Sequence, residues 1–150
     1  MIVAGIDEAG YGPLLGPLVV SVTAFRVPDP EDPAGPPPNL WDLLQAAVTR
    51  ERDSSRVRVD DSKRLFQQKK GLRGLEEGLF PFLAVGGAPI PRDFRSFLAR
   101  VGSRALDPRG GATAYLEDYP WYRDANVDLP ADTFSNFVET RGKQLGDAMD

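Results

Sequence analysis

The chain has 150 residues, enough for one domain with a real core, and its 41% hydrophobic and 27% charged residues are typical of globular proteins. It contains no cysteine and no histidine, which excludes disulfides, thiolate nucleophiles, Ser-His-Asp triads and metal sites built on those residues. Catalysis would therefore depend on carboxylates, lysine, tyrosine, hydroxyl groups or a hard cation such as Mg²⁺ or Mn²⁺. The net charge of −4 counts mildly against a nucleic-acid partner, although a local basic strip or bound metal ions would compensate for it.

The beginning of the chain predicts a β-hairpin. Residues 2–6 are mostly apolar and predict a buried central strand that ends at Asp7 and Glu8. A Gly- and Pro-rich turn follows, and the β-rich stretch 18–27 favours an antiparallel partner strand. No signal peptide or membrane-spanning segment is visible in the sequence, so we expect a cytoplasmic protein.

The middle of the chain predicts helices separated by irregular connections. Residues 28–38 are rich in proline and predict an exposed loop. Asn39 is a candidate N-cap for a helix over residues 40–48, where apolar residues recur with helical spacing. A further helix is plausible over residues 65–79, although three glycines weaken it, and residues 82–85 resemble a strand.

The last third predicts an amphipathic helix over residues 92–101, a strand over residues 112–116, and a final helix. Asp132 or Thr133 is the candidate cap of that final helix. No Gly or Pro stop signal follows its last apolar residue, so we interpret the chain as the N-terminal portion of a longer protein.

Asp7 and Glu8 carry the most informative chemistry. Two carboxylates at the exit of an apolar strand are costly unless they are solvated, paired or bound to a cation. Gly10 and Gly12, on either side of Tyr11, allow the backbone to approach a bulky group such as a phosphate, although they do not match the dinucleotide-binding fingerprint. Neighbouring side chains of a regular strand face opposite ways, so both carboxylates reach one ion only if the chain is distorted there. The same residues also suit an ordinary tight turn.

A second group of polar residues spans residues 60–64, Asp-Asp-Ser-Lys-Arg. The Ser62 hydroxyl beside the cations of Lys63 and Arg64 is suited to binding a phosphate. The alternative is a solvated helix start in which Ser62 is the cap and the two cations are ordinary surface charges. Taken alone, this segment favours the alternative.

Together the two segments resemble one family. Residues 5–20, GIDEAGYGPLLGPLVV, closely resemble the N-terminal signature of type 2 ribonucleases H, and residues 61–65, DSKRL, resemble the next motif of that family. The resemblance implies an α/β fold in which a mixed ribonuclease H-like sheet is flanked by helices. The fold is expected to be incomplete here and to carry insertions at residues 28–38 and 89–130.

The resemblance also implies cleavage of the RNA strand of an RNA–DNA hybrid, or cleavage beside a ribonucleotide in DNA. The family holds Mg²⁺ or Mn²⁺ with four carboxylates, and Asp7 and Glu8 match the first two of these catalytic, metal-binding positions. The backbone of Gly10, Tyr11 and Gly12 and the side chain of Lys63 match substrate-binding positions. Ser62 joins them as a candidate hydroxyl contact to a phosphate.

The sequence departs from the family pattern in two ways. Tyr11 stands where the family usually has Arg or Lys, so a phosphate-directed charge is lost. Asp118, Asp124 and Asp128 lack the strand-then-Asp-Gly setting of the family's third carboxylate. We expect the remaining catalytic segments beyond Asp150, in which case the isolated chain is inactive.

Two other hypotheses stay open at this stage. One is a non-catalytic nucleic-acid-binding relative that has lost part of the carboxylate set. The other is a protein-interaction domain that uses the apolar faces predicted over residues 40–48 and 134–149, although such faces usually pack into a domain's own core.

Overall fold

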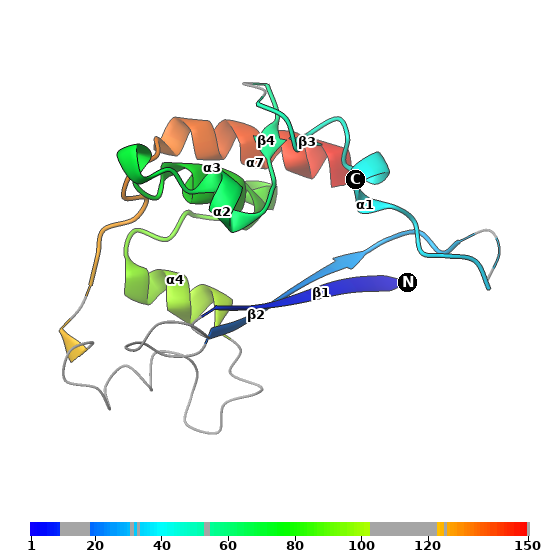
Figure 1. The fold of residues 1–150 in the computed structure, drawn as a ribbon, viewed down its shortest axis with the longest axis horizontal. Helices are drawn as coiled ribbons and strands as arrows, with labels where there is room; N and C mark the ends of the chain where they lie inside the picture. Colours follow the sequence, from blue (N-terminus) through cyan, green and yellow to red (C-terminus); the bar gives the residue numbers. More distant parts are fainter. Residues whose placement is uncertain are drawn as a thin grey trace. The chain divides into compact units, whose positions relative to one another are not determined.

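The computed structural model describes residues 1–9, 19–30, 32, 34–52, 55–102, 123–124 and 126–149. The chain is a mixed α/β protein with small sheets and several helices, which confirms the predicted class at this coarse level (Figure 1). It divides into two compact units, Met1–Leu43 and Leu44–Asp150. Among the helices of the described ranges, none combines the length and the apolar character needed to cross a bilayer.

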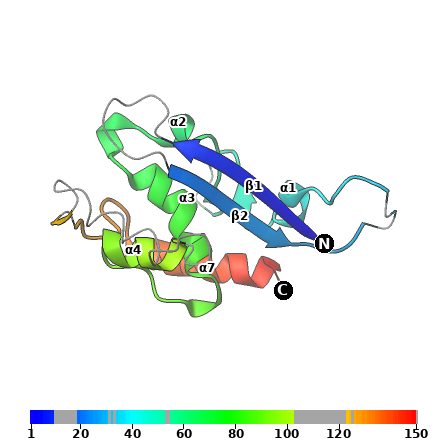
Figure 2. The same cartoon turned by 90° about the horizontal axis from the view of Figure 1, so that it is seen from below.

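The first unit is built on the predicted hairpin. Strands β1 (Ile2–Ala9) and β2 (Val19–Arg26) are antiparallel, with every residue of one paired to a residue of the other (Figure 2). The N-terminal ammonium closes the open end of this ladder: it donates to the carbonyl of Val27 at 2.9 Å and to the carboxylate of Asp29 at 2.6 Å. The prediction of an antiparallel hairpin is confirmed.

The hairpin is not buried, however. Ile2 is 67% exposed and Ile6 is 73% exposed, and Val22, the cross-strand partner of Ile6, is 60% exposed. The ladder satisfies the inner hydrogen bonds of the two strands while these apolar side chains stay exposed. The prediction that residues 2–6 form a buried central strand was therefore wrong.

The predicted helix after the proline-rich loop is much shorter than expected. Asn39 does act as its cap, since its side-chain oxygen accepts the N–H of Trp41 at 3.0 Å. Helix α1 (Leu40–Leu43) then ends after four residues. The following apolar residues enter strand β3 (Val48–Thr49), which pairs in parallel with β4 (Val57–Arg58) and buries Val57 completely. Pairing of strands thus overrides the helical spacing of this sequence.

In the second unit, three separate helical elements stand in place of the single helix predicted over residues 65–79. These are α2 (Ser62–Leu65), the 3-10 helix η1 (Gln68–Lys70) and α3 (Arg73–Leu83). Gly71 separates η1 from α3 with a φ of 54°, a conformation that other residues rarely adopt. The predicted strand at residues 82–85 was wrong, because α3 runs to Leu83 and the 3-10 helix η2 (Val85–Gly87) follows.

The two later helices were predicted correctly as elements. Helix α4 (Phe94–Val101) starts with a capping box in which Asp93 and Ser96 bond each other's backbone N–H. Just before it, residues 92–94 form a short antiparallel contact with residues 127–129, centred on the Asp93–Asp128 bridge. Helix α7 (Ser135–Met149) is the predicted final helix. The strand expected over residues 112–116 lies outside the described residues.

The core of the second unit lies between α3 and α7, which run side by side (Figure 1). Phe80, Ala84 and Val138 form the buried cluster, and the ring of Phe97 from α4 meets Phe80 edge-on at 6.2 Å. Gly142 permits this packing, because a Cβ there would lie 2.8 Å from the Cβ of Ala84.

A buried carboxylate joins the start of α3 to the entry of α7. Glu76, 5% exposed, accepts the backbone N–H groups of Ala131 at 2.6 Å and of Asp132 and Thr133 at 2.9 Å. In the opposite direction, the side chain of Asp132 accepts the backbone N–H of Leu72 at 2.7 Å. This reciprocal arrangement, called here the Glu76 clamp, explains why Asp132 and Thr133 do not cap α7, contrary to the prediction.

Candidate functional site

Asp7 and Glu8 lie in the last three residues of β1, within a regular ladder. Asp7 is paired with Ser21 and Glu8 with Val20, and both carboxylates are exposed to solvent. The Asp7 carboxylate accepts the N–H of Glu8 at 2.9 Å. Since neighbouring side chains of a regular strand project from opposite faces, the structure does not bring these two carboxylates together. Local distortion of the strand, the condition for sharing one ion, is not found here.

Three of the predicted substrate-binding residues cannot be placed in this site. Gly10, Tyr11 and Gly12 lie outside the described residues. Their proposed backbone contact to a phosphate therefore stays a prediction.

The second predicted segment forms a well-defined helix start. Asp61 is the N-cap of α2: its side chain accepts the N–H of Lys63 at 2.8 Å, and its carbonyl accepts the N–H groups of Arg64 and Leu65. Ser62 is the first helical residue and is exposed. The alternative of a helix start is thus correct in outline, with the cap one residue earlier than Ser62.

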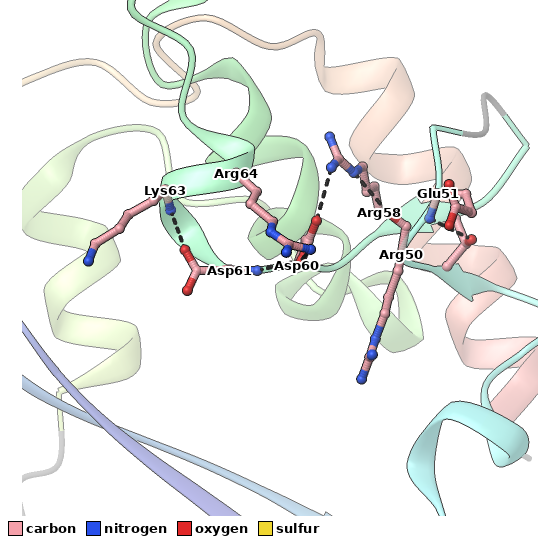
Figure 3. Close-up of polar contacts among 8 residues, drawn as sticks. Arg50, Glu51, Arg58, Asp60, Asp61, Lys63 and Arg64 are labelled. Carbon is pink, nitrogen blue, oxygen red and sulfur yellow. Dashed lines mark hydrogen bonds and ion pairs between the residues drawn. The ribbon is translucent and has the colours of Figure 1, made fainter.

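Asp60 organises the cations on one side of this helix start (Figure 3). Its carboxylate, 12% exposed, contacts Arg58 at 3.0 Å and the more exposed Arg64 at 3.6 Å. The N–H of Asp61, donated to the carboxylate, is the main factor that lowers the pKa of Asp60, and the two arginines act in the same direction against partial burial. Arg58 also donates to the carbonyl of Arg50. Asp60 therefore stays ionised and holds two guanidinium groups in place.

Lys63 differs from these arginines. Its side chain is exposed and extends away from the ion pairs around Asp60 (Figure 3). Within the described ranges, no acidic side chain lies within ion-pair distance of its ammonium group. The Asp61 cap fixes the backbone while leaving this cation available for a ligand.

Acidic residues do not gather elsewhere in the described part of the chain: no group of three or more there could hold a metal ion. Asp124 and Asp128 are exposed, and Asp128 takes part in the backbone bridge to Asp93. Asp118 lies outside the described residues. The third and fourth carboxylates are therefore not located, and their expected position beyond Asp150 stays a prediction.

Sequence reasoning missed a concentration of positive charge around the second motif. Residues 50–73 contain nine basic and four acidic residues, a net charge of +5 in a chain whose total is −4. Three of the chain's four lysines, Lys63, Lys69 and Lys70, fall within eight residues, and all three are exposed. The signal was readable in the sequence as lysine spacing, but the overall acidic balance obscured it.

In comparisons with known proteins, no family model, no curated protein and no solved structure matches this chain.

Proposed function

We propose that this chain is the N-terminal portion of a metal-dependent endonuclease of the type 2 ribonuclease H kind, with a ribonuclease H-like fold. Its substrate is the RNA strand of an RNA–DNA hybrid, or DNA that contains ribonucleotides. The observation that carries the proposal is the setting of the two motifs. Asp7 and Glu8 are exposed at the end of the first hairpin strand, and Lys63 is exposed beside the Asp61 cap of α2.

The donor atoms at Asp7 and Glu8 suit Mg²⁺ or Mn²⁺, because hard cations prefer carboxylate oxygens. Asp7 and Glu8 would contribute oxygen ligands to such ions, which would supply Lewis-acid activation of a water molecule and charge stabilisation at a leaving oxygen. Asp7 and Glu8 alone do not fit a complete two-metal site, since they project from opposite faces of β1. The proposal therefore requires further carboxylates from the longer protein.

On the substrate side, Lys63 supplies a positive charge to the phosphodiester backbone. Arg58 and Arg64 are occupied by Asp60, whereas Lys63 retains its full donor capacity toward a ligand. The exposed hydroxyl of Ser62 is a second donor at the same helix start. Gly10, Tyr11 and Gly12 complete the proposed substrate contacts through their backbone.

The test is cleavage of an RNA–DNA hybrid by the longest natural protein that contains this chain, with Mg²⁺ or Mn²⁺. We expect Asp7→Asn to abolish cleavage, because an amide is a poor ligand for a hard cation in place of a carboxylate. Asp42→Asn is the matched control: it removes an exposed aspartate of the same unit outside both motifs. Cleavage by Asp7→Asn at the wild-type rate would contradict the assignment.

A non-catalytic nucleic-acid-binding protein is the second candidate. It is favoured by the opposite orientation of Asp7 and Glu8 and by the lack of a three-carboxylate group in the described ranges. Retained binding of hybrids by the longest natural protein, without cleavage in either metal, would favour this candidate over the nuclease.

A further inference from the structure

We propose that Lys69 and Lys70, in η1, form a second phosphate-binding position for a nucleic-acid duplex, in addition to Lys63. This inference rests on the proposed function, which names a nucleic acid as the ligand. It adds a part of the chain outside both sequence motifs to the substrate surface.

The first argument is the pairing of charges around η1. Lys69 and Lys70 are exposed, and no acidic partner lies within ion-pair distance of either in the described part of the chain. By contrast, Arg73 is bound to Glu77 at 2.7 Å, and this contact raises the pKa of Arg73. The fourth lysine, Lys143, also has no ion pair in the described part of the chain, but Glu139 and Asp147 lie four residues away on either side of it along α7, where helix geometry makes them neighbours. Three of the four lysines, each without an acidic partner in the described ranges, are thus concentrated between residues 63 and 70.

The second argument is that the backbone beneath these lysines is fixed. The N–H of Lys70 donates to the carbonyl of Gln67 at 2.7 Å, closing the turn of η1. Two residues after Lys70, the backbone N–H of Leu72 donates to the side chain of Asp132, which belongs to the Glu76 clamp. A ligand therefore orders only the lysine side chains and not the chain that carries them, which lowers the entropy lost on binding.

The third argument is reach. Seven residues separate Lys63 from Lys70, and seven residues span at most roughly 25 Å when fully extended. The phosphates of one strand recur about every 3.4 Å along the axis of the duplex, so both positions fall within roughly seven nucleotides of each other. Lysine is a compact point charge without the fork of arginine, which suits sequence-independent contact to phosphates.

The test is the salt dependence of binding. A fluorescent RNA–DNA hybrid of about 12 base pairs is titrated with the chain at about 50 to 200 mM salt, and the affinity is plotted against salt on logarithmic axes. We expect the combined Lys69→Gln and Lys70→Gln variant to reduce the slope by about 2, since each phosphate contact contributes about 0.9. Lys143→Gln is the matched control and should keep the wild-type slope.

An unchanged slope in the double variant, with native circular dichroism, would overturn the proposal. Equal displacement of the hybrid by polyglutamate of matched charge would also overturn it, because the surface would then be a site for acidic proteins. A failure of the proposed function can be distinguished from a failure of this inference by combining the slope with a cleavage assay. If the double variant reduces the salt-dependence slope but the longest natural protein does not cleave the hybrid, the lysine surface is supported and the nuclease is contradicted. If the protein cleaves the hybrid but the slope is unchanged in the double variant, the nuclease is supported and the lysine surface is contradicted.

Discussion

The two units of this chain keep their structure in different ways. The first unit, Met1–Leu43, is held by the ladder between β1 and β2, and large apolar side chains such as Ile6 remain in solvent. The second unit, Leu44–Asp150, encloses residues such as Val138 and Leu145 completely and adds the Glu76 clamp. Backbone pairing dominates in one unit and buried side chains dominate in the other.

This difference also distinguishes the two motifs on which the proposed function rests. The carboxylates of Asp7 and Glu8 belong to a hairpin whose large apolar side chains, such as Ile2 and Ile6, are exposed, and two-stranded hairpins are marginally stable in water. Lys63 belongs to the unit with the buried core. We therefore expect the backbone that carries Lys63 to be more stable against unfolding than the strand that carries the two carboxylates. The carboxylates should depend on additional structure for their stability.

The largest expected effect contrasts a core residue with an exposed one. Leu145→Ala should lower the free energy of unfolding by about 2–5 kcal/mol, because it removes a fully buried side chain and leaves a cavity. Ile6→Ala should change it by less than about 1 kcal/mol, since Ile6 loses only its cross-strand contact. Denaturant unfolding followed by circular dichroism measures both. Equal losses would show that the hairpin is covered in solution and would break the contrast.

A smaller effect is expected at the Glu76 clamp. Glu76→Gln replaces a buried carboxylate that accepts three N–H groups, and we expect a loss of about 1–3 kcal/mol. Glu77→Gln is the neighbouring control: it removes the charge of the partly exposed pair with Arg73, keeps an acceptor for the 3.5 Å contact from the Thr133 hydroxyl, and should cost much less. Hydrogen exchange at residues 131–133 should accelerate only in the first variant. Unchanged exchange there would refute the role of the clamp.

The caps of the two units provide a finer comparison. Asp93→Ala removes the capping box of an eight-residue helix and should cost about 1 kcal/mol of unfolding free energy. Asn39→Ala removes the cap of the four-residue α1 and should cost less, because so short a helix contributes little by itself. Thermal unfolding of both variants gives the order, and a reversed order would contradict this reasoning.

The smallest expected effect is the contribution of the Asp60 carboxylate to the pH dependence of stability. Its pKa is lowered in the folded state, so its stabilising contribution is present above the ordinary value of 3.8 and is lost as pH falls through the lowered value. Asp60→Asn should be less stable than the wild type at neutral pH, and the two should converge as the pH falls below 3.8. Arg64→Gln should retain most of this pH effect, since the Asp61 N–H is the main cause. The free energy of unfolding is measured against pH for each protein. Parallel curves for the wild type and Asp60→Asn would rule out this role of Asp60.

Features set by neighbours in sequence were predictable. The turn-rich sequence after β1 predicted the hairpin, Asn39 predicted the start of α1, and the spacing of apolar residues predicted α4 and α7. Each depends on interactions within a few residues. The class of the fold followed from the same local information.

Features set by distant contacts were not predictable. Residues 82–85 have the composition of a strand, yet packing against α7 keeps them in and beside α3. Asp132 has the identity of a cap, yet it bonds Leu72, sixty residues away in sequence. The exposure of Ile6 could not be predicted either, because the number of strands beside a hairpin is not a local property. For the candidate site, the sequence correctly indicated the helix start before Lys63 but not the role of Asp60.

The bridge between Asp93 and Asp128 has a consequence for how the second unit tolerates changes of chain length. The backbone N–H of Phe94 donates to the carbonyl of Val127 and that of Leu129 to the carbonyl of Arg92, both at 2.8 Å, so the segment before α4 is tied directly to the segment that leads to α7. The entropy of closing a loop grows only slowly with its length, by about 0.6 kcal/mol per doubling. Because the bridge already joins the two segments, changing the number of residues between α4 and Val127 should alter the stability of the second unit only slightly.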